Sequence, residues 1–166
     1  LHFTQTYRQL SKLSAATFRP VAVWALFEHV VTLLEPTFMQ RGLDPAIVLP
    51  DTDLHIVADA TLIEQVLINL VTNALEALQH QPAPQLRLAA YAQAPHRVVL
   101  EVSDNGPGIE PSLLDEIFVP FFTTKKAGSG IGLSLSRQIM QLHRGSIQVQ
   151  SEVGKGSQFQ LLFPKE

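Results

Sequence analysis

The sequence contains no cysteine among its 166 residues. Disulfide bonds, thiolate metal sites and cysteine nucleophiles are therefore excluded, and the composition is compatible with the reducing cytoplasm. No apolar run reaches the ~18 to 20 residues of a membrane-spanning helix, and no signal peptide opens the chain. The charged residues are few (16%), nearly balanced (net charge −3) and scattered, so we expect this domain to contact neither nucleic acid nor membrane.

What the sequence does contain is apolar: 46% of its residues are hydrophobic, which is typical of a globular domain and not of a disordered chain. A length of 166 residues is that of one domain with a single core. The chain begins at Leu1 rather than Met, and Phe3, Tyr7 and Leu10 recur at helical spacing. We therefore interpret residues 1–17 as the tail of an upstream helix with a linker, and residues 18–166 as the domain.

Hydrophobic periodicity predicts three helices and several short strands in this domain. The helices are expected at 23–41, 59–79 and 133–143. A short extended entry is expected at 18–22, and strands at 47–49, 54–58, 86–92, 98–103, 146–151 and 157–163, with 47–58 and 146–163 as hairpins. Gly42 should end the first helix, Pro36 should disturb its last turns, and Asp59 should cap the second. This mixture favours an α+β sandwich of one sheet against a helical layer, rather than a βαβ array.

The second helix carries a polar stripe beside its apolar one. Gln65, Asn69, Asn73 and Glu76 recur at three- and four-residue spacing, which places them along one side. A solvated stripe usually carries Lys, Arg and Glu, whereas this helix has neither Lys nor Arg and has Asn, a poor helix former, at two positions. The amides either satisfy local hydrogen bonds or present carbonyl oxygens to a hard cation with an anionic ligand. Mg²⁺ suits the second interpretation.

A strand leads directly into the glycine-rich sequence 104–109, Asp-Asn-Gly-Pro-Gly-Ile. One interpretation is a plain turn. The other assigns a function to each part: the Asp104 carboxylate accepts a hydrogen bond from the exocyclic amine of adenine, and Gly106 and Gly108 let the backbone approach the base. Guanine has a carbonyl at the same edge, so the carboxylate would also exclude it.

Three further glycines, at 128, 130 and 132, precede the last helix. Glycines before a helix N-terminus leave backbone N–H groups free to bind phosphate, although the spacing is neither that of a P-loop nor that of a dinucleotide fingerprint. Between the two glycine runs, residues 118–126 combine aromatic side chains with two threonines and two lysines. This segment is either a hydrophobic anchor or a lid that closes over a nucleotide and brings a lysine to its phosphates.

Taken in order, these segments resemble the ATP-binding catalytic domain of sensor histidine kinases, within the larger group that includes gyrase, the Hsp90 chaperones and MutL. The boxes that the resemblance matches are 59–77 (N box), 104–109 (first glycine box), 118–125 (phenylalanine box), 130–133 (second glycine box) and 154–157 (small final box). The residues at 73–77 and 120–125 are similar to those of the nitrogen-regulator branch of these kinases. The resemblance implies a Bergerat-type two-layer α/β sandwich, with a mixed, mainly antiparallel sheet covered by three helices.

The resemblance also implies roles for individual residues. Asn73 would bind Mg²⁺, Asp104 would bind the adenine amine, and Ser157 would support that carboxylate. The catalytic residues would be Asn69, beside the phosphates, and Lys125, which would reach them from the lid. The other nucleotide-contacting positions that it implies are Ala77, Gly106, Gly108, Ile109, Thr124, Gly128, Gly130, Ile131, Gly132 and Leu133.

Asn69 stands where the gyrase and chaperone relatives have a Glu that activates water, and an amide cannot take up that proton. Phosphoryl transfer to a protein nucleophile is therefore favoured over hydrolysis. None of the six histidines is followed by the acidic residue or Asn that marks the family's phosphoacceptor, so we expect the phosphoacceptor and dimerisation helices upstream of Leu1. Glu76 stands where many members have a Lys, which removes one candidate phosphate contact.

We therefore expect a protein-histidine kinase domain that binds ATP and Mg²⁺. The γ-phosphate of ATP would pass to a histidine on a separate helical domain and then to an aspartate of a response regulator. The isolated chain should be a cytoplasmic monomer, and its parent a homodimer that is either soluble or anchored in the inner membrane. The alternatives are an ATPase or serine-kinase relative of the same fold, and a non-catalytic docking module controlled by nucleotide.

Overall fold

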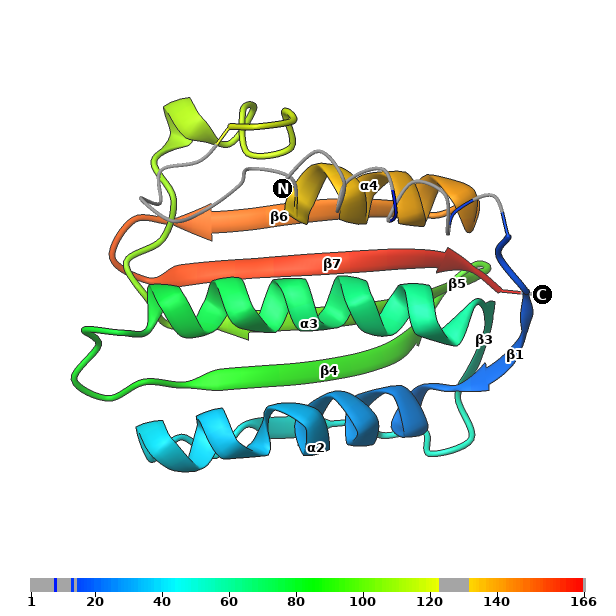
Figure 1. Ribbon diagram of the computed structural model, residues 1–166, viewed down its shortest axis with the longest axis horizontal. Helices are drawn as coiled ribbons and strands as arrows, with labels where there is room; N and C mark the ends of the chain where they lie inside the picture. Colours follow the sequence, from blue (N-terminus) through cyan, green and yellow to red (C-terminus); the bar gives the residue numbers. More distant parts are fainter. Residues whose placement is uncertain (1–7, 9–12, 14, 123–131, 166) are drawn as a thin grey trace.

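The computed structural model describes residues 8, 13, 15–122 and 132–165. Within them, three helices lie side by side on one face of a five-stranded sheet, and a two-stranded sheet lies at one end (Figure 1). The helices are α2 (Val23–Arg41), α3 (Ala60–Ala77) and α4 (Gly132–Leu142), with a 3₁₀ turn, η1, at Pro111–Leu113. The strands are β1 (Arg19–Ala22), β2 (Ala46–Val48), β3 (His55–Ala58), β4 (Leu86–Gln93), β5 (Arg97–Asp104), β6 (Ser146–Glu152) and β7 (Gly156–Pro164).

The larger sheet has the strand order β2-β4-β5-β7-β6. Its pairs β4–β5, β5–β7 and β6–β7 are antiparallel, whereas β2 and β4 are parallel. This mixed, mainly antiparallel sheet under three helices confirms the expected α+β sandwich. In the register, Asp104 lies between Leu86 of β4 and Ser157 of β7. The central strand β5 therefore brings Asp104 to the end of the molecule where α3 also ends (Figure 1).

The predicted hairpin at 47–58 is wrong. β2 pairs in parallel with β4, whereas β3 pairs antiparallel with β1. The turn between them is present, since the N–H of Asp53 donates to Asp51 Oδ1 (2.9 Å). After this turn, the carbonyl of Leu54 accepts the N–H of Val23 (3.0 Å), which leads β3 to the start of α2 and away from β2. A turn signal predicts only that the chain reverses, and tertiary packing decides which strands pair.

The helix ends follow the sequence signals, with one exception. Gly42 ends α2 in the left-handed region (φ +62°), where a glycine costs least. Asp59 caps α3, because its Oδ1 accepts the N–H of Leu62 (3.2 Å). Pro36 was expected to disturb the last turns of α2, yet the helix continues to Arg41. The proline lies on the exposed side of α2, where water can satisfy the carbonyl that its missing N–H leaves free.

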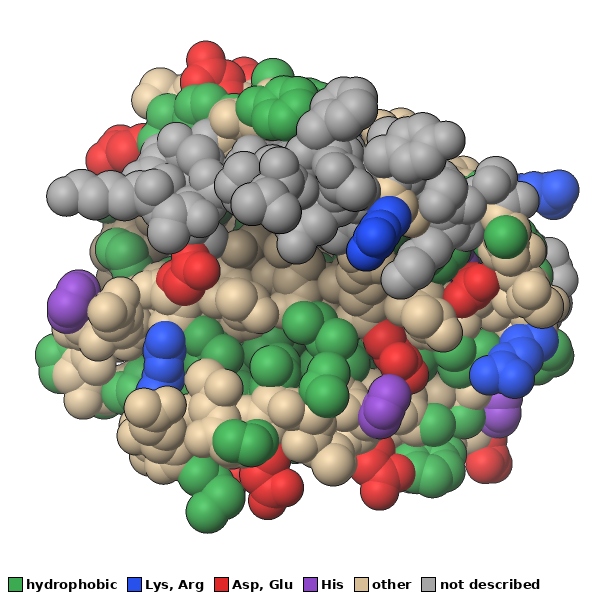
Figure 2. Space-filling view, viewed as in Figure 1, with side chains coloured by type: hydrophobic (Ala, Val, Ile, Leu, Met, Phe, Trp, Pro, Cys, Tyr) green, Lys and Arg blue, Asp and Glu red, His purple; other side chains and the backbone are tan. Residues whose placement is uncertain are grey.

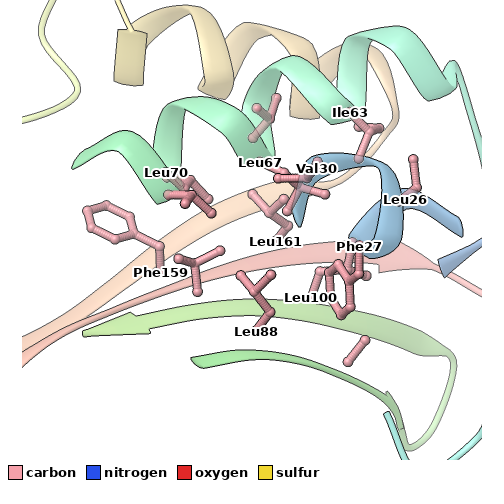
Figure 3. Packing of buried hydrophobic residues seen from close by; sticks show 14 of the residues in the cluster. Leu26, Phe27, Val30, Ile63, Leu67, Leu70, Leu88, Leu100, Phe159 and Leu161 are labelled. Carbon is pink, nitrogen blue, oxygen red and sulfur yellow. The ribbon is translucent and has the colours of Figure 1, made fainter. Parts of the chain in front are cut away.

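The core fills the space between the helical layer and the inner face of the sheet. Figure 3 shows side chains of α2 and α3 pointing toward those of β4, β5 and β7. The labelled residues, all buried, are Leu26, Phe27, Val30, Ile63, Leu67, Leu70, Leu88, Leu100, Phe159 and Leu161. The residues of α2 and α3 recur at three- or four-residue spacing, and Phe159 and Leu161 of β7 are two residues apart, so each of these elements directs one apolar face toward this core.

The beginning of the chain is described only in part. Leu13 and Ala16 pack against the core, so the segment before β1 contacts the domain. The division between a linker at 1–17 and a domain at 18–166 stays a prediction. Within the described residues, no helix has both the length and the apolar character of a membrane span.

Candidate functional site

Asp104 is the candidate residue with the most distinctive environment. Its Oδ1 accepts the N–H of Gly106 (2.9 Å), and the backbone N–H of Ser157 donates to the same carboxyl group. Burial raises the pKa of Asp104 above its ordinary 3.8, and the two N–H donors offset part of that rise. The result is a half-buried carboxylate, held by backbone donors, of the kind that accepts a strong hydrogen bond from an amine.

Close backbone approach explains two of the glycines around Asp104. A Cβ atom on Gly106 would lie 2.9 Å from the carbonyl oxygen of Ala77 and 2.9 Å from Asp104 Oδ1. At Gly156 (φ +119°), a Cβ atom would lie 1.9 Å from the carbonyl oxygen of Asp104. The end of β5, the last turn of α3 and the start of β7 therefore meet with no side chain between them. The structure thus brings three predicted residues, Ala77, Asp104 and Gly106, together.

The rest of the first glycine run packs on the β6–β7 turn. The N–H of Ile109 donates to Ser151 Oγ (2.8 Å), and a Cβ atom on Gly108 (φ +77°) would lie 2.3 Å from a carbonyl oxygen at the end of β6. The hydroxyls of Ser151 and Ser157 share a hydrogen bond of 2.8 Å. Ser157 therefore contacts the carboxyl of Asp104 through its backbone, while its hydroxyl contacts Ser151. Gly108 and Ile109 fix the loop against the sheet.

Asn69 of α3 contacts the first turn of α4. Its Nδ2 donates to Ser136 Oγ (3.2 Å), and the Ser136 hydroxyl donates to the carbonyl of Gly132 (2.8 Å). A Cβ atom on Gly132 would lie 2.3 Å from Asn69 Oδ1, so only glycine allows this contact without displacing the amide. The structure thus brings Asn69 together with the N-terminus of α4, where the helix dipole favours anions.

Asn69, Asn73 and Ala77 recur every four residues on α3 and form a row ~12 Å long. The row runs from the α4 contact to the Asp104 end, with the half-buried Asn73 midway. In Figure 2, hydrophobic side chains gather on the side of α3 toward α2, whereas mostly tan atoms line the side toward α4. Amide oxygens are hard ligands of the kind that Mg²⁺ uses together with phosphate and water, so Asn69 and Asn73 fit that ion.

Five predicted site residues lie outside the described residues: Thr124, Lys125, Gly128, Gly130 and Ile131. In the described part of the phenylalanine box, Phe118 packs against the core, and Arg137 of α4 lies 5.7 Å from its ring centroid. Leu133 also packs against the core. Phe118 therefore holds this segment against the core. The lid interpretation concerns mainly residues 123–126, which lie outside the described residues.

Asn105, for which the sequence indicated no function, connects the glycine run to the loop before β4. Its Oδ1 accepts the N–H of Gln85 (2.7 Å), and its Nδ2 donates to the carbonyl of Ala83 (2.9 Å). The backbone N–H of Asn105 also donates to the carbonyl of Gln85 (3.3 Å). Asn is common in turns, so its local sequence gives no sign of partners about 20 residues away.

Residues 58–166 match the family of histidine kinase-, DNA gyrase B- and HSP90-like ATPases. The signal transduction histidine-protein kinase AtoS of Escherichia coli is 34% identical over 160 residues, which cover 96% of this chain and 26% of AtoS. The sensor histidine kinase ZraS of Salmonella typhimurium is 33% identical over 156 residues, which cover 94% of this chain and 33% of ZraS. The chain therefore spans about a quarter to a third of the length of these relatives.

Solved structures of histidine kinases share the fold. The nucleotide-free catalytic domain of ThkA has a TM-score of 0.81 and 34% identity, with 90% of this chain and 96% of that chain covered. Full-length ShkA in complex with AMPPNP has a TM-score of 0.80 and 28% identity, with 94% of this chain and 34% of that chain covered. ThkA in complex with the response regulator TrrA has a TM-score of 0.79 and 28% identity, with 99% of this chain and 48% of that chain covered. This chain belongs to the family of histidine kinase-, DNA gyrase B- and HSP90-like ATPases, as a catalytic domain of the sensor histidine kinase type.

Proposed function

We propose that the chain binds ATP with Mg²⁺ and donates the γ-phosphate to a histidine on a separate helical segment, for onward transfer to an aspartate of a response regulator. The observation that carries this proposal is the half-buried carboxylate of Asp104, at the Ala77 end of the row that Asn69, Asn73 and Ala77 form on α3. The carboxylate would accept the adenine amine. The other end of the row meets the N-terminus of α4, which favours phosphate. The length of this row, ~12 Å, suits the distance from the base to the phosphates in an extended nucleotide.

The described residues favour transfer over hydrolysis. Asn73 would give an amide oxygen to Mg²⁺, and Asn69 would lie beside the phosphates. Mg²⁺ supplies charge neutralisation for phosphoryl transfer when it is bound. The Asn69 amide cannot take up a proton, and its Nδ2 already donates to Ser136. Asn69 would therefore position the phosphates and leave the nucleophile to another segment.

The remaining assignments rest on the family. Lys125 would reach the phosphates, and the backbone N–H groups around Gly128, Gly130 and Gly132 would surround them. ShkA was solved with AMPPNP and ThkA with a response regulator, which supports ATP and a regulator as ligand and partner for this chain as well. A cytoplasmic location of the domain, within a homodimeric parent, is part of the same proposal.

Nucleotide titration tests the binding step. ATP should bind more tightly with Mg²⁺ than without it, and GTP should bind weakly. Asp104→Asn should weaken ATP binding about 10- to 100-fold, because a hydrogen bond to a charged group contributes about 1.5–3 kcal/mol. The exposed Asp44, in the loop before β2, provides the control Asp44→Asn, which should bind ATP normally. Equal affinity of Asp104→Asn and the wild type for ATP would remove the adenine assignment.

A phosphotransfer assay tests the second step, with the upstream phosphoacceptor segment present in the same polypeptide. Acid-labile, alkali-stable phosphate should then appear on histidine, and Asn73→Ala should abolish it. Rapid release of free phosphate by the chain alone would instead favour the ATPase alternative. Normal ATP binding without any transfer would favour the docking module.

A further inference from the structure

A cluster of Thr17, Phe18, Asp59 and His143, here called the anchor, holds the segment that leads into β1. Both carboxylate oxygens of Asp59 are used in it. Oδ1 accepts the N–H of Leu62 and caps α3 (3.2 Å), whereas Oδ2 accepts the backbone N–H of Thr17 (2.9 Å). One side chain therefore joins the start of α3 to the chain that comes from upstream.

His143 adds the end of α4 to the anchor. The backbone N–H of Asp59 can only donate, and it lies 3.0 Å from His143 Nε2, so Nε2 accepts and the ring proton is on Nδ1. Nδ1–H then donates to the carbonyl of Ile139 (2.7 Å), in the last turn of α4. Phe18 contacts the same ring edge-on, with 4.9 Å between ring centroids. The buried imidazole thus connects Phe18, α3 and α4 at one point.

The anchor lies at the opposite end of the helical layer from the candidate nucleotide site. α3 starts at Asp59 in the anchor and ends at Ala77, beside Asp104. α4 starts at Gly132, in contact with Asn69, and ends just before His143. Figure 1 shows the two helices side by side, with the start of α3 next to β3 and the end of α4 next to the segment that leads into β1. The two helices that carry the candidate site are therefore both attached, at their far ends, to the incoming chain.

We propose that Asp59 and His143 are positioning residues, which fix the path of the incoming chain relative to the nucleotide site. This inference rests on the proposed function, because a fixed path sets where the phosphates of bound ATP lie relative to a phosphoacceptor on the upstream segment. Without the anchor, ATP would still bind, but the γ-phosphate would meet its acceptor less often. Misplacement by ~1 Å can cost about 100-fold in rate.

Asp59→Ser tests the contact itself, because serine is as good an N-cap as aspartate but offers one short hydroxyl instead of two carboxylate oxygens. In hydrogen exchange of this chain, followed residue by residue, the amide of Thr17 should lose protection in Asp59→Ser, while the amide of Leu62 should keep it. Unchanged protection of Thr17 would overturn the anchor. This readout needs neither nucleotide nor phosphotransfer, so it tests the contact independently of the proposed function.

Phosphotransfer in the longer polypeptide tests the positioning. Asp59→Ser should lower the transfer rate about tenfold or more, with the Kd for ATP and the Tm within the range of the control. That control is Asp51→Ser, which removes a carboxylate that also accepts a backbone N–H (Asp53, 2.9 Å) but in a turn between strands. A normal rate would overturn the proposal, and so would a joint loss of Tm, ATP affinity and transfer, since that is a purely structural effect. If the wild-type protein transfers no phosphate, the proposed function and the positioning fall together, while the exchange result still decides whether the anchor exists.

Discussion

Two carboxylates at opposite ends of α3 show how residues of one type are used differently in this domain. Asp59 has both oxygens engaged by backbone N–H groups of this chain. Asp104 is half-buried, accepts N–H groups from Gly106 and Ser157, and has a raised pKa because burial penalises its charge. A carboxylate whose burial is not fully compensated by its own chain gains most from an external donor such as an amine.

The raised pKa of Asp104 also predicts a pH dependence of ligand binding. Accepting the adenine amine requires the ionised carboxylate, so the affinity for ATP should fall as the pH decreases toward that raised pKa. Asp104→Asn should show a flatter pH profile in the same titration, because the titrating group has been removed. Parallel profiles of the two proteins below pH 6 would contradict this assignment.

His143 should make the stability of the fold sensitive to acid. Burial lowers the pKa of its imidazole below the ordinary 6.5, and the bond to Ile139 and the charge of Asp59 oppose this only in part. The folded chain therefore prefers the neutral ring. Its contribution to the free energy of unfolding is complete above about pH 6.5 and is lost as the pH falls through the lowered pKa.

Urea unfolding of the wild type and His143→Gln at several pH values measures this effect. Glutamine also offers an acceptor to the N–H of Asp59 but does not titrate. The difference in free energy of unfolding between the two proteins should therefore shrink from pH 7.5 to pH 5, since the other titrating groups are common to both. A difference that stays constant would mean that His143 is not held neutral.

Gly132→Ala separates helix propensity from the geometry of the site. Propensity alone predicts added stability of at most about 1 kcal/mol, because alanine is the best helix former and Gly132 is the first residue of α4. The new Cβ atom would, however, lie 2.3 Å from Asn69 Oδ1 and displace the amide from Ser136. We expect ATP affinity to fall about tenfold in a calorimetric titration. The fall should be much smaller when Asn69→Ala is the background, since the two changes share one contact.

At the element scale, the end of α2 offers a test of backbone conformation alone. Gly42 has φ +62°, and no atom lies within 4 Å of the position that a Cβ would take. Gly42→Ala should therefore destabilise the fold by about 1–2 kcal/mol through the left-handed conformation, with no steric clash. Gly42→Asn should cost less, because asparagine tolerates this region better. Chemical unfolding of both variants measures the difference, and equal stabilities would contradict the cap assignment.

The elements also show where local signals stop being sufficient. The hairpin β6–β7 was predicted from its glycine turn and its alternating pattern, and both strands pair as expected. The segment 47–58 has an equally good turn, yet its two strands belong to different sheets. The difference is that β6 and β7 pair with each other inside the larger sheet, whereas β2, whose three residues are all exposed, pairs with β4, and β3 pairs with β1 in the smaller sheet.

For the whole molecule, the prediction concerns what this chain does alone. None of its six histidines has the sequence context of the family's phosphoacceptor. We expect the isolated chain to sediment as a monomer and to incorporate no phosphate from labelled ATP, although it binds the nucleotide. A longer polypeptide that carries the proposed phosphoacceptor segment should show both dimerisation and labelling. Labelling of the isolated chain on any histidine would place the phosphoacceptor within it.

The sequence by itself determined whatever depends on neighbours along the chain. The Asp59 cap, the Gly42 stop and the helix stripes arise from contacts within a few residues, so they can be read from spacing, and the order of the boxes is a property of the sequence itself. The α+β sandwich followed from the mixture of predicted helices and strands, and the family from the order of the boxes.

Only the tertiary structure decided which distant residues meet. The pairing of β2 with β4, the contact of Asn69 with Gly132 and the bond between Asp59 and His143 join segments that no local pattern relates. Such contacts form because burying the shared core stabilises one arrangement of all the elements together. A side chain's distant partner is therefore a property of the whole packed molecule.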